Sequence, residues 1–390
     1  MVQSPPSGCV FWSQEWTCGV FWGPRDGLPR TVRDKKSRFR SAWRLPGALL
    51  LFLFTIPKLY EVYYPFTQDV PSIHRNMDVI IPALKPTCVS RHVLNSINRY
   101  LKPRRILVIT ADQRRCESFT RMASGVECLI EDKIFPNLTH AHVSRYFRQA
   151  HGMKARYDSD FGDTRAGWYF QQFLKMGVSQ HLPNLSEHYL VWDSDMVILR
   201  PMEVLRGNKT VVQIGGHILP TYDATYRRLF GVAPASYYDN NKQKSFIAHN
   251  MVVYKPYMRE LLENLSRRYG DSDSWPYHIM DQAGAGVGRE SMPMYGFSEY
   301  STYISWVKQH YPESQYILPS QRWRRDPLDI VNRLTHVIGG PSDAWQVCCP
   351  QPWMLWLNWL IGFDYVGFEV ATHHTSVSKN LKAHCNFEET

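Results

Sequence analysis

The segment that most constrains this chain is a short apolar strand followed by two closely spaced acids. The run from Tyr189 to Trp192 predicts a buried strand, and Asp193 and Asp195 follow it at positions i and i+2. Carboxylate oxygens at the end of a buried strand form a hard, anionic site that suits Mg²⁺ or Mn²⁺. Such an ion holds a diphosphate and stabilises it as a leaving group. The segment therefore indicates the chemistry of nucleotide-sugar transfer.

Strand and helix patterns alternate along the chain around this segment. Strands are predicted over residues 77–82, 105–110, 126–130, 189–192, 210–214 and 247–254, and helices over residues 90–101, 116–122, 168–176 and 257–269. This alternation predicts an α/β fold with a mostly parallel central sheet flanked by helices. Ligands bind outside the carboxyl ends of the strands in such sheets, and Asp193 and Asp195 follow such an end.

The first 76 residues predict a membrane anchor. Residues 1–44 read as a basic cytosolic tail, residues 45–64 as a signal-anchor and residues 65–76 as a short stem, which leaves residues 77–390 as a lumenal catalytic domain. Positive charge before an apolar run and tyrosines after it favour this orientation. The apolar run is shorter than the roughly 20 residues that span a bilayer, so a buried or interfacial helix is the alternative.

The charge of the chain is concentrated in the same region. Residues 1–60 hold nine Lys and Arg against three Asp and Glu, so +6 of the formal net charge of +10 lies there. The remaining residues show no long basic stripe with interleaved aromatics. We therefore expect no nucleic-acid partner.

Sequons and cysteines after the apolar run suggest a glycoprotein. Asparagine sequons occur at residues 137, 184, 208 and 264, and six cysteines follow residue 64. An oxidising compartment would allow disulfides, whose pairing the sequence leaves open. The adjacent Cys348 and Cys349 are expected to form bridges elsewhere rather than with each other. We expect a single-pass type II protein of the Golgi or endoplasmic reticulum membrane.

Several segments resemble GT-A-type glycosyltransferases. The likeness is carried by the Trp-Asp-Ser-Asp motif within 189–201, by Gly167–Lys175, by Phe246–Lys255 and by Gly296–Tyr303. It is closest to a group of DxD proteins of largely unassigned function. The resemblance implies a Rossmann-like GT-A fold and a Mn²⁺- or Mg²⁺-dependent hexosyl- or pentosyltransferase. The donor would be a nucleoside-diphosphate sugar, with a UDP-sugar favoured, and the acceptor a glycan or glycoconjugate.

The resemblance also implies roles for particular residues. Asp193 would face the ribose or sugar of the donor and help to bind the metal, and Asp195 would bind the metal. Glu299 would be the general base if the reaction inverts configuration. A histidine near the C-terminus often completes such a metal site. There are three candidates, of which we favour the second: His336, His373 and His374.

Three further side chains are candidates for contact with the donor. Gln172 and Lys175 lie at helical spacing on one predicted helix, and the guanidinium of Arg165 would suit a phosphate. A solvated Arg165 and an ordinary amphipathic helix are the alternatives. The tryptophans that could stack on sugar rings, with core packing as the alternative, are Trp306, Trp323, Trp345 and Trp353.

Two other interpretations remain open. The sequence Asp193-Ser-Asp195-Met-Val197 also fits a haloacid-dehalogenase-type phosphatase, in which Asp193 would be the nucleophile. In that class, however, the motif ends the first strand of the sheet. A non-catalytic, carbohydrate-binding relative that kept the fold is the third interpretation. A second Asp-Ser-Asp sequence at residues 158–160 follows no apolar strand and predicts a loop.

Overall fold

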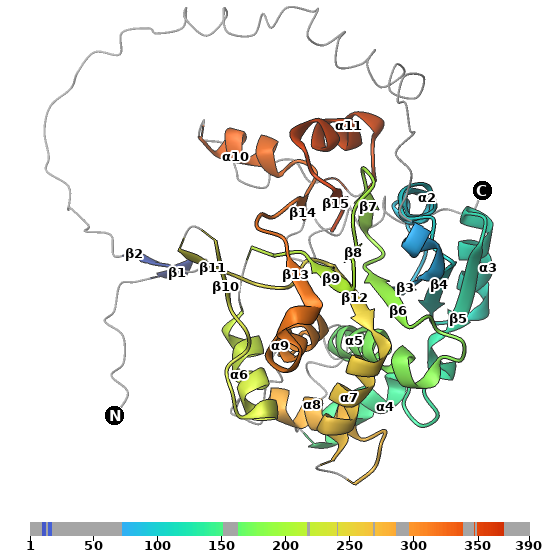
Figure 1. Ribbon diagram of the computed structural model, residues 1–390, viewed down its shortest axis with the longest axis vertical. Helices are drawn as coiled ribbons and strands as arrows, with labels where there is room; N and C mark the ends of the chain where they lie inside the picture. Colours follow the sequence, from blue (N-terminus) through green and yellow to red (C-terminus); the bar gives the residue numbers. More distant parts are fainter. Residues whose placement is uncertain are drawn as a thin grey trace, which may run out of the picture. The chain divides into compact units, whose positions relative to one another are not determined.

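A five-stranded mixed sheet organises the chain in the computed structural model (Figure 1). Its strands are, in spatial order, β12 (Asn250–Tyr254), β6 (His188–Trp192), β3 (Asp78–Pro82), β4 (Arg105–Thr110) and β5 (Val126–Ile130). β6, β3, β4 and β5 run parallel to one another, and β12 pairs with β6 antiparallel. The predicted mostly parallel sheet is confirmed.

Both faces of this sheet are buried. Ile80 and Val191 belong to the hydrophobic core on one face, and Val79 and Trp192 belong to the core on the other. Side chains alternate between the two faces along each strand, so a strand that is covered on both sides reads as a continuous apolar run. This explains why the central strands were recognisable as short apolar segments.

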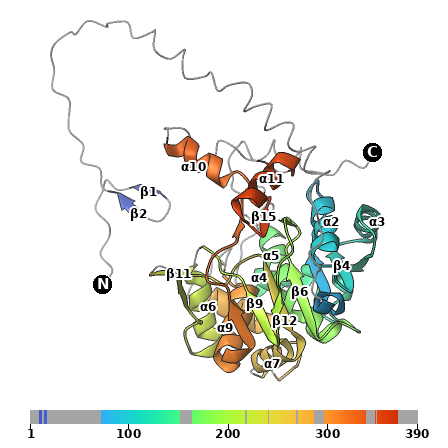
Figure 2. The same cartoon turned by 45° about the horizontal axis from the view of Figure 1, so that its top comes forward.

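Helices cover the two faces (Figures 1 and 2). The first core receives side chains from α4 (His140–Ala150), α5 (Asp163–His181), α7 (Lys255–Ser266), α8 (Trp275–Gly284) and α9 (Glu299–His310). The second core receives them from α2 (Ser90–Tyr100), α3 (Gln113–Met122) and α11 (Pro352–Ile361). α6 (Pro220–Phe230) packs two partly buried apolar side chains against the first core, and α10 (Asp329–Val337) packs one against the second.

Smaller sheets surround the central one. β8 (Leu205–Arg206), β9 (Lys209–Val212) and β13 (Gln315–Ile317) form one of them, and β10 (Tyr237–Asp239) pairs with β11 (Lys242–Lys244) in a hairpin. β7 (Met196–Ile198), β15 (Tyr365–Gly367) and β14 (Trp323–Arg324) form another. The antiparallel pairing of β15 with β7 brings residues near 369 back beside Asp195.

Some predicted elements differ from the structure in extent or place. The helix predicted over 168–176 is the middle of the longer α5. The strand predicted over 247–254 begins only at Asn250, because His249 adopts a left-handed backbone conformation with φ 60°. The strand predicted over 210–214 is β9, which lies in a small sheet and not in the central one.

Two disulfides connect different elements of the chain. Cys88 pairs with Cys349, which ties the loop before α2 to the segment before α11. Cys116 of α3 pairs with Cys128 of β5. The expectation that Cys349 does not form a disulfide with its neighbour Cys348 is therefore confirmed.

The structure describes residues 10–12, 15–17, 72–150, 163–216, 219–239, 241–267, 270–285, 296–337, 347 and 349–369. Two units are distinguished, Met1–Phe52 and Leu53–Thr390. In the first unit β1 (Val10–Trp12) pairs antiparallel with β2 (Glu15–Thr17). The predicted anchor at 45–64 and the Asp-Ser-Asp sequence at 158–160 lie outside the described residues. Among the described helices, none combines the length and apolarity needed to cross a bilayer.

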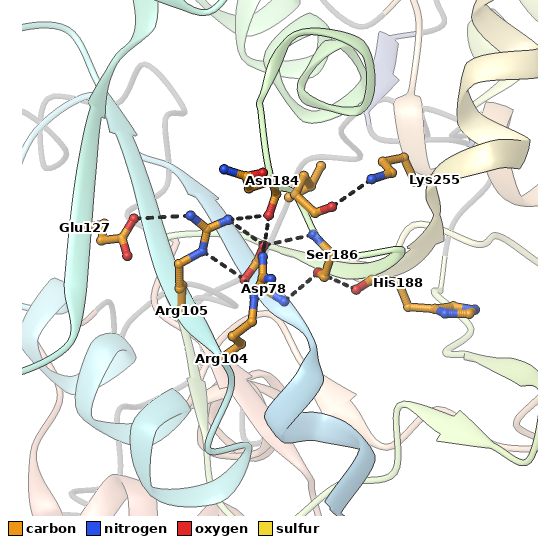
Figure 3. Close-up of polar contacts among 9 residues, drawn as sticks. Asp78, Arg104, Arg105, Glu127, Asn184, Ser186, His188 and Lys255 are labelled. Carbon is orange, nitrogen blue, oxygen red and sulfur yellow. Dashed lines mark hydrogen bonds and ion pairs between the residues drawn. The ribbon is translucent and has the colours of Figure 1, made fainter.

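A buried carboxylate joins the amino ends of the parallel strands (Figure 3). Asp78, at the start of β3, is fully buried. Its Oδ2 accepts hydrogen bonds from Arg104 Nη2 at 2.5 Å, from Arg105 Nη2 at 2.8 Å and from the Ser186 backbone N–H at 3.0 Å. Burial raises the pKa of Asp78, but these donors outweigh burial and lower it to about 2. The group holds the starts of β3 and β4 against the loop that precedes β6.

We predict that Asp78→Asn lowers the free energy of unfolding by about 2 kcal/mol at neutral pH. The folded-state pKa lies below the ordinary value of 3.8, so the stabilisation is present above about pH 4 and is lost as the pH falls towards 2. Denaturant unfolding at a series of pH values measures both effects. Glu127→Gln is the control, because that side chain is 53% exposed and lies 3.5 Å from Arg105. An equal loss in both variants would contradict the prediction.

Candidate active site

The two acids of the Trp-Asp-Ser-Asp motif lie in a turn at the carboxyl end of β6. The backbone N–H of Met196 donates to the Asp193 carbonyl at 3.3 Å, which closes the turn before β7. The indole N–H of the fully buried Trp192 donates to the Met196 carbonyl at 2.8 Å, which anchors the turn to the core. Strand and turn together fix where both carboxylates project from the sheet.

Asp193 is surrounded by hydrogen-bond donors from three other elements. Its Oδ1 accepts from Lys175 Nζ of α5 at 2.6 Å and from the Tyr300 hydroxyl of α9 at 2.7 Å. Its Oδ2 lies 2.9 Å from Nδ1 of His249, which precedes β12. Burial raises the pKa of Asp193, but Lys175 and His249 outweigh it and hold the pKa well below its usual range. Asp193 is therefore a fixed anion.

Lys175 is a buried cation shared by two carboxylates. Its Nζ donates to Glu299 Oε1 at 2.7 Å as well as to Asp193, and its side chain is only 4% exposed. Burial lowers the pKa of Lys175, but the two carboxylates outweigh it and raise the pKa above its ordinary value. Burial raises the pKa of Glu299. The ammonium thus ties α5 and α9 to the end of β6.

Gln172 supports this group from one turn earlier on α5. Its Oε1 accepts from the backbone N–H of Glu299 at 3.1 Å, and its Nε2 donates to the Trp168 carbonyl at 3.4 Å. The side chain is 2% exposed. Gln172 therefore satisfies the first turn of α9, which the Ser298 side chain also caps. The structure places Gln172 in the support of this group, and its contact with a donor stays a prediction.

His249 connects Asp193 to the C-terminal strand. Its Nε2 lies 3.3 Å from Glu369 Oε1, two residues after the end of β15. The edge of its ring meets Trp323, with centroids 5.0 Å apart. Burial lowers the pKa of His249, but the hydrogen bond to Asp193 and the charge of Glu369 outweigh it and raise the pKa. The left-handed backbone conformation of His249 aims the ring between the two acids.

Asp195 and Glu369 form a pair of acids beside Asp193 and His249. The backbone N–H of Phe368 donates to the Asp195 carbonyl at 3.0 Å, which places the neighbouring Glu369 next to the motif. Burial and the charges of Glu369 and Asp193 raise the pKa of Asp195 to about 7. Arg325 forms an ion pair with the other oxygen of Glu369. Two carboxylates held together in this way favour a cation between them.

The donor set suits a divalent ion only in part. Within the described residues, no three His, Cys, Asp or Glu side chains form a complete metal-binding group. Asp195 and Glu369 supply carboxylate oxygens, and His249 Nε2 supplies an imidazole nitrogen that Mn²⁺ accepts. Mg²⁺ is commonly held by one or two carboxylates with substrate phosphates completing the shell. Asp195 and Glu369 therefore offer two carboxylates to such a metal, and substrate phosphates would have to complete its shell.

Other predicted site residues lie elsewhere. Arg165 is ten residues before Lys175 on α5, which puts it about 15 Å away along the helix axis. His336 is in the last turn of α10. His373 and His374 lie outside the described residues. Arg165 is therefore not brought to the acids.

Three members of the site were not among the predicted residues. His249 lies in one of the segments that carry the resemblance to GT-A enzymes. Its left-handed backbone conformation keeps it out of the expected strand, and the local sequence does not indicate that conformation. Tyr300 directly follows Glu299 in the same motif, but the sequence did not single it out as a site residue. Glu369 reaches Asp195 through the pairing of β15 with β7, which no sequence spacing indicates.

Comparisons with known proteins identify a family and distant structural neighbours. A family profile described as "Family of unknown function (DUF6492)" matches residues 90–322. No curated protein sequence matches the chain.

Three solved structures illustrate the structural neighbours. Mouse xyloside xylosyltransferase 1 in its apo form is 12% identical, covers 77% of this chain and 99% of its own, and has a TM-score of 0.38. An active-site mutant of LgtC is 10% identical, covers 80% and 97%, and has a TM-score of 0.32. The bifunctional glycosyltransferase WbbM is 11% identical, covers 78% and 47%, and has a TM-score of 0.33. Similarity at these scores decides neither the fold nor the function of this chain.

We predict that Lys175→Met lowers the free energy of unfolding by about 3 to 5 kcal/mol, because it leaves two buried carboxylates without their cation. Chemical denaturation of the purified variant measures this loss. Lys209→Met is the matched control, since Lys209 is 43% exposed and pairs with the 91% exposed Glu313. The control should cost less than about 1 kcal/mol. Adding Glu299→Gln to Lys175→Met should recover part of the loss, and a strictly additive double variant would count against the shared ion pair.

Proposed function

The chain belongs to a family of unknown function, DUF6492, and from the geometry of its site we propose that it is a metal-dependent glycosyltransferase. It would move a sugar from a nucleoside-diphosphate sugar to a hydroxyl of a glycan or glycoconjugate. The observation that carries the proposal is the group of Asp193, Asp195, His249 and Glu369 at the carboxyl end of the central strand β6. This is the edge at which open α/β sheets bind their ligands.

Asp195, Glu369 and Nε2 of His249 would hold the divalent ion. Bound there, the ion would neutralise the charge of the departing diphosphate. His249 makes a contact with Asp193 through its other ring nitrogen, at 2.9 Å. A carboxylate on the far side of a ligating histidine fixes the tautomer and orientation of the ring. Asp193 would in this way support the metal site without being its main ligand.

Asp193 keeps capacity for one more hydrogen bond. An ionised carboxylate offers about four acceptor positions, and Lys175, Tyr300 and His249 occupy three of them. The remaining position, on Oδ2, would accept a hydroxyl of the donor. The 15% exposure of the side chain leaves a path for that contact. Asp193 would therefore orient the donor, as the resemblance implies.

Glu299 has a different role in this proposal from that of a general base. Its side chain is 4% exposed and its Oε1 accepts from Lys175 at 2.7 Å. A base must come within hydrogen-bond reach of the acceptor hydroxyl. Glu299 instead holds Lys175 in place and so fixes Asp193. The group that accepts the acceptor proton is left unassigned.

A haloacid-dehalogenase-type phosphatase fits the site less well. Such an enzyme needs a carboxylate oxygen of Asp193 as its nucleophile. Both oxygens of Asp193 are instead engaged by the donors of Lys175, Tyr300 and His249, which lowers their nucleophilicity. The motif also ends the fourth strand of the chain's central sheet in sequence order from β3, not the first. A non-catalytic relative would not need the acids Asp195 and Glu369 side by side at this edge of the sheet.

The setting we propose is the lumen of the Golgi or endoplasmic reticulum, with a UDP-sugar as the favoured donor. Two disulfides, Cys88–Cys349 and Cys116–Cys128, support an oxidising compartment. The sequon residues Asn137, Asn184 and Asn208 are exposed, which supports access for glycosylation.

The proposal predicts metal-dependent nucleotide binding that requires Asp195. Calorimetric titration of the full chain with UDP, GDP, ADP and CDP, with and without Mn²⁺, should show that one nucleotide binds only with the metal. Asp195→Ala should weaken that binding by at least about tenfold, because it removes a charged ligand. Asp132→Ala, at an exposed position, is the control. Failure of all four nucleotides to bind with Mn²⁺ would overturn the proposal.

A second variant tests the contribution of the C-terminal strand to the metal site. Glu369→Gln should weaken Mn²⁺ affinity by at least about tenfold, because it replaces a charged ligand with a neutral amide. Paramagnetic broadening or calorimetry with Mn²⁺ and the bound nucleotide measures it. Glu313→Gln, at a 91% exposed side chain, should leave the affinity unchanged. Equal Mn²⁺ affinity in the two variants would remove Glu369 from the site.

A further inference from the structure

The helix α11 is apolar on all sides, although most of its residues are not buried. Apart from Pro352 and Asn358, every residue of this helix is a large apolar one, and none carries a charge. Within α11 only Met354 and Asn358, one turn apart, are buried. A surface helix normally turns a polar face to water, whereas a helix that is apolar all round lies in a core or in a membrane. α11 therefore needs an apolar partner besides the core.

One narrow side of α11 attaches the helix to the rest of the molecule. The side-chain amide of Asn358 donates to the Pro327 carbonyl at 3.0 Å and to the Met354 carbonyl at 2.8 Å. The apolar side chains of α11 that pack partly against the second core are Trp353, Leu355 and Trp359. The opposite side of the helix is free of these contacts.

The outer side of α11 is a continuous apolar face. Trp356 and Leu357 are half-buried, and Leu360 and Ile361, four residues later, are 58% and 43% exposed. Residues that are three or four positions apart are neighbours on one side of a helix. These four side chains consequently lie next to one another, with no polar residue between them.

α10 extends this apolar surface. Leu334 and Val337 of α10 are 62% and 82% exposed, and both views show α10 and α11 at the same end of the molecule (Figures 1 and 2). Among the described residues, four of the seven exposed large apolar side chains lie on these two helices. Single exposed apolar residues are ordinary, whereas a group of them marks a surface that another apolar body covers.

Arginines border the apolar surface. In the described residues 322–337 and 349–369, the exposed ionised side chains are Arg322, Arg325 and Arg333. Each forms an ion pair in which the carboxylate is the less exposed partner, so the guanidinium lies nearer to the solvent. An apolar face with a rim of guanidinium groups complements a bilayer, in which phosphates lie above the acyl chains.

The tryptophans of α11 also suit the boundary between lipid and water. Trp353, Trp356 and Trp359 follow one another at three-residue spacing, and all three are half-buried. Tryptophan is enriched at this boundary because its ring is apolar and its indole N–H is polar.

Other tryptophans that were candidates for stacking on sugar rings have no such position. Trp306 is 1% exposed and Trp323 is 4% exposed, so both are core residues. Trp345 lies outside the described residues. Trp353, the fourth candidate, is part of α11. The half-buried tryptophans of this group are therefore those of the apolar helix.

The predicted anchor would keep this part of the chain close to a bilayer. The anchor ends at residue 64, and the described chain resumes at residue 72. Eight residues of fully extended chain span at most roughly 30 Å. A domain on so short a connection would meet the membrane with part of its own surface.

We infer that α11, together with the exposed end of α10, lies in the surface of a phospholipid bilayer. Trp356 and Leu360 would enter the boundary between headgroups and acyl chains, and the bordering arginines would contact lipid phosphates. A helix of ten residues is about 15 Å long, half the apolar thickness of a bilayer, so it lies along the membrane and does not cross it. β15 follows α11 and leads to Glu369, so one short segment joins this surface to the acid pair.

A photoreactive lipid tests the inference on the full chain. The chain is reconstituted in vesicles of phosphatidylcholine and phosphatidylserine that carry a phosphatidylcholine with a photoreactive acyl chain. After illumination, mass spectrometry identifies the labelled peptides. We expect label on residues 352–361, and label on the anchor at 45–64 serves as an internal standard.

The double variant Leu360→Glu with Ile361→Glu should reduce labelling of 352–361 by at least about tenfold, because two aliphatic contacts are lost and two charges would have to enter the apolar layer. The matched control is Val232→Glu with Tyr238→Glu, at side chains that are 52% and 63% exposed. It should leave the labelling unchanged. Denaturant unfolding of both double variants checks that the fold is kept.

Three results would overturn the inference. They are label on 45–64 with none on 352–361, no label on any part of the chain, and equal labelling of 352–361 in the wild type and the Leu360 and Ile361 variant. The face would then be covered by a second copy or by another segment of the chain. Label on 352–361 without label on 45–64 would support the inference and reject the predicted anchor.

Discussion

The buried ammonium of Lys175 is the interaction on which the site depends, because it is the contact through which three separate elements meet. It bonds to Asp193 at the end of β6 and to Glu299 at the start of α9, and it is itself part of α5. A buried cation between two carboxylates must keep close contacts with both, since either acid left alone would be a desolvated charge. The position of Asp193, and through His249 that of the second acid pair, follows from this constraint.

The two ends of the parallel strands carry polar groups of opposite character. At the amino ends, Asp78 is saturated by Arg104, Arg105 and Ser186 and is closed to solvent. At the carboxyl ends, Asp193 is held in a similar way, whereas Asp195 lies beside a second acid, Glu369, and its pKa is raised to about 7 by burial and by the neighbouring negative charges. A closed polar cluster stabilises the fold, whereas a buried acid beside a second acid suits a ligand that brings positive charge. The same sheet thus carries a closed polar cluster at one end and the candidate site at the other.

The C-terminal part of the chain completes the site. β15 pairs with β7, and this pairing delivers Glu369 to Asp195. The disulfide between Cys88 and Cys349 ties the segment before α11 to the loop that follows β3, which steadies the same part of the molecule. Arg325 adds an ion pair to Glu369. Residues more than 170 positions apart in sequence therefore form one acid pair.

The sequence was enough to predict the alternating strands and helices, the mostly parallel sheet and the place of β6 in it, because burial on both faces leaves a local apolar signature. The position of Asp193 and Asp195 at the carboxyl end of a buried strand followed from the same apolar run. The partners of these acids were not predictable. His249 depends on a left-handed backbone conformation, Glu369 on a strand pairing, and the burial of Glu299 and Gln172 on how α5 packs against α9. Local periodicity records which side chains are buried, but only packing between distant segments decides which buried groups meet.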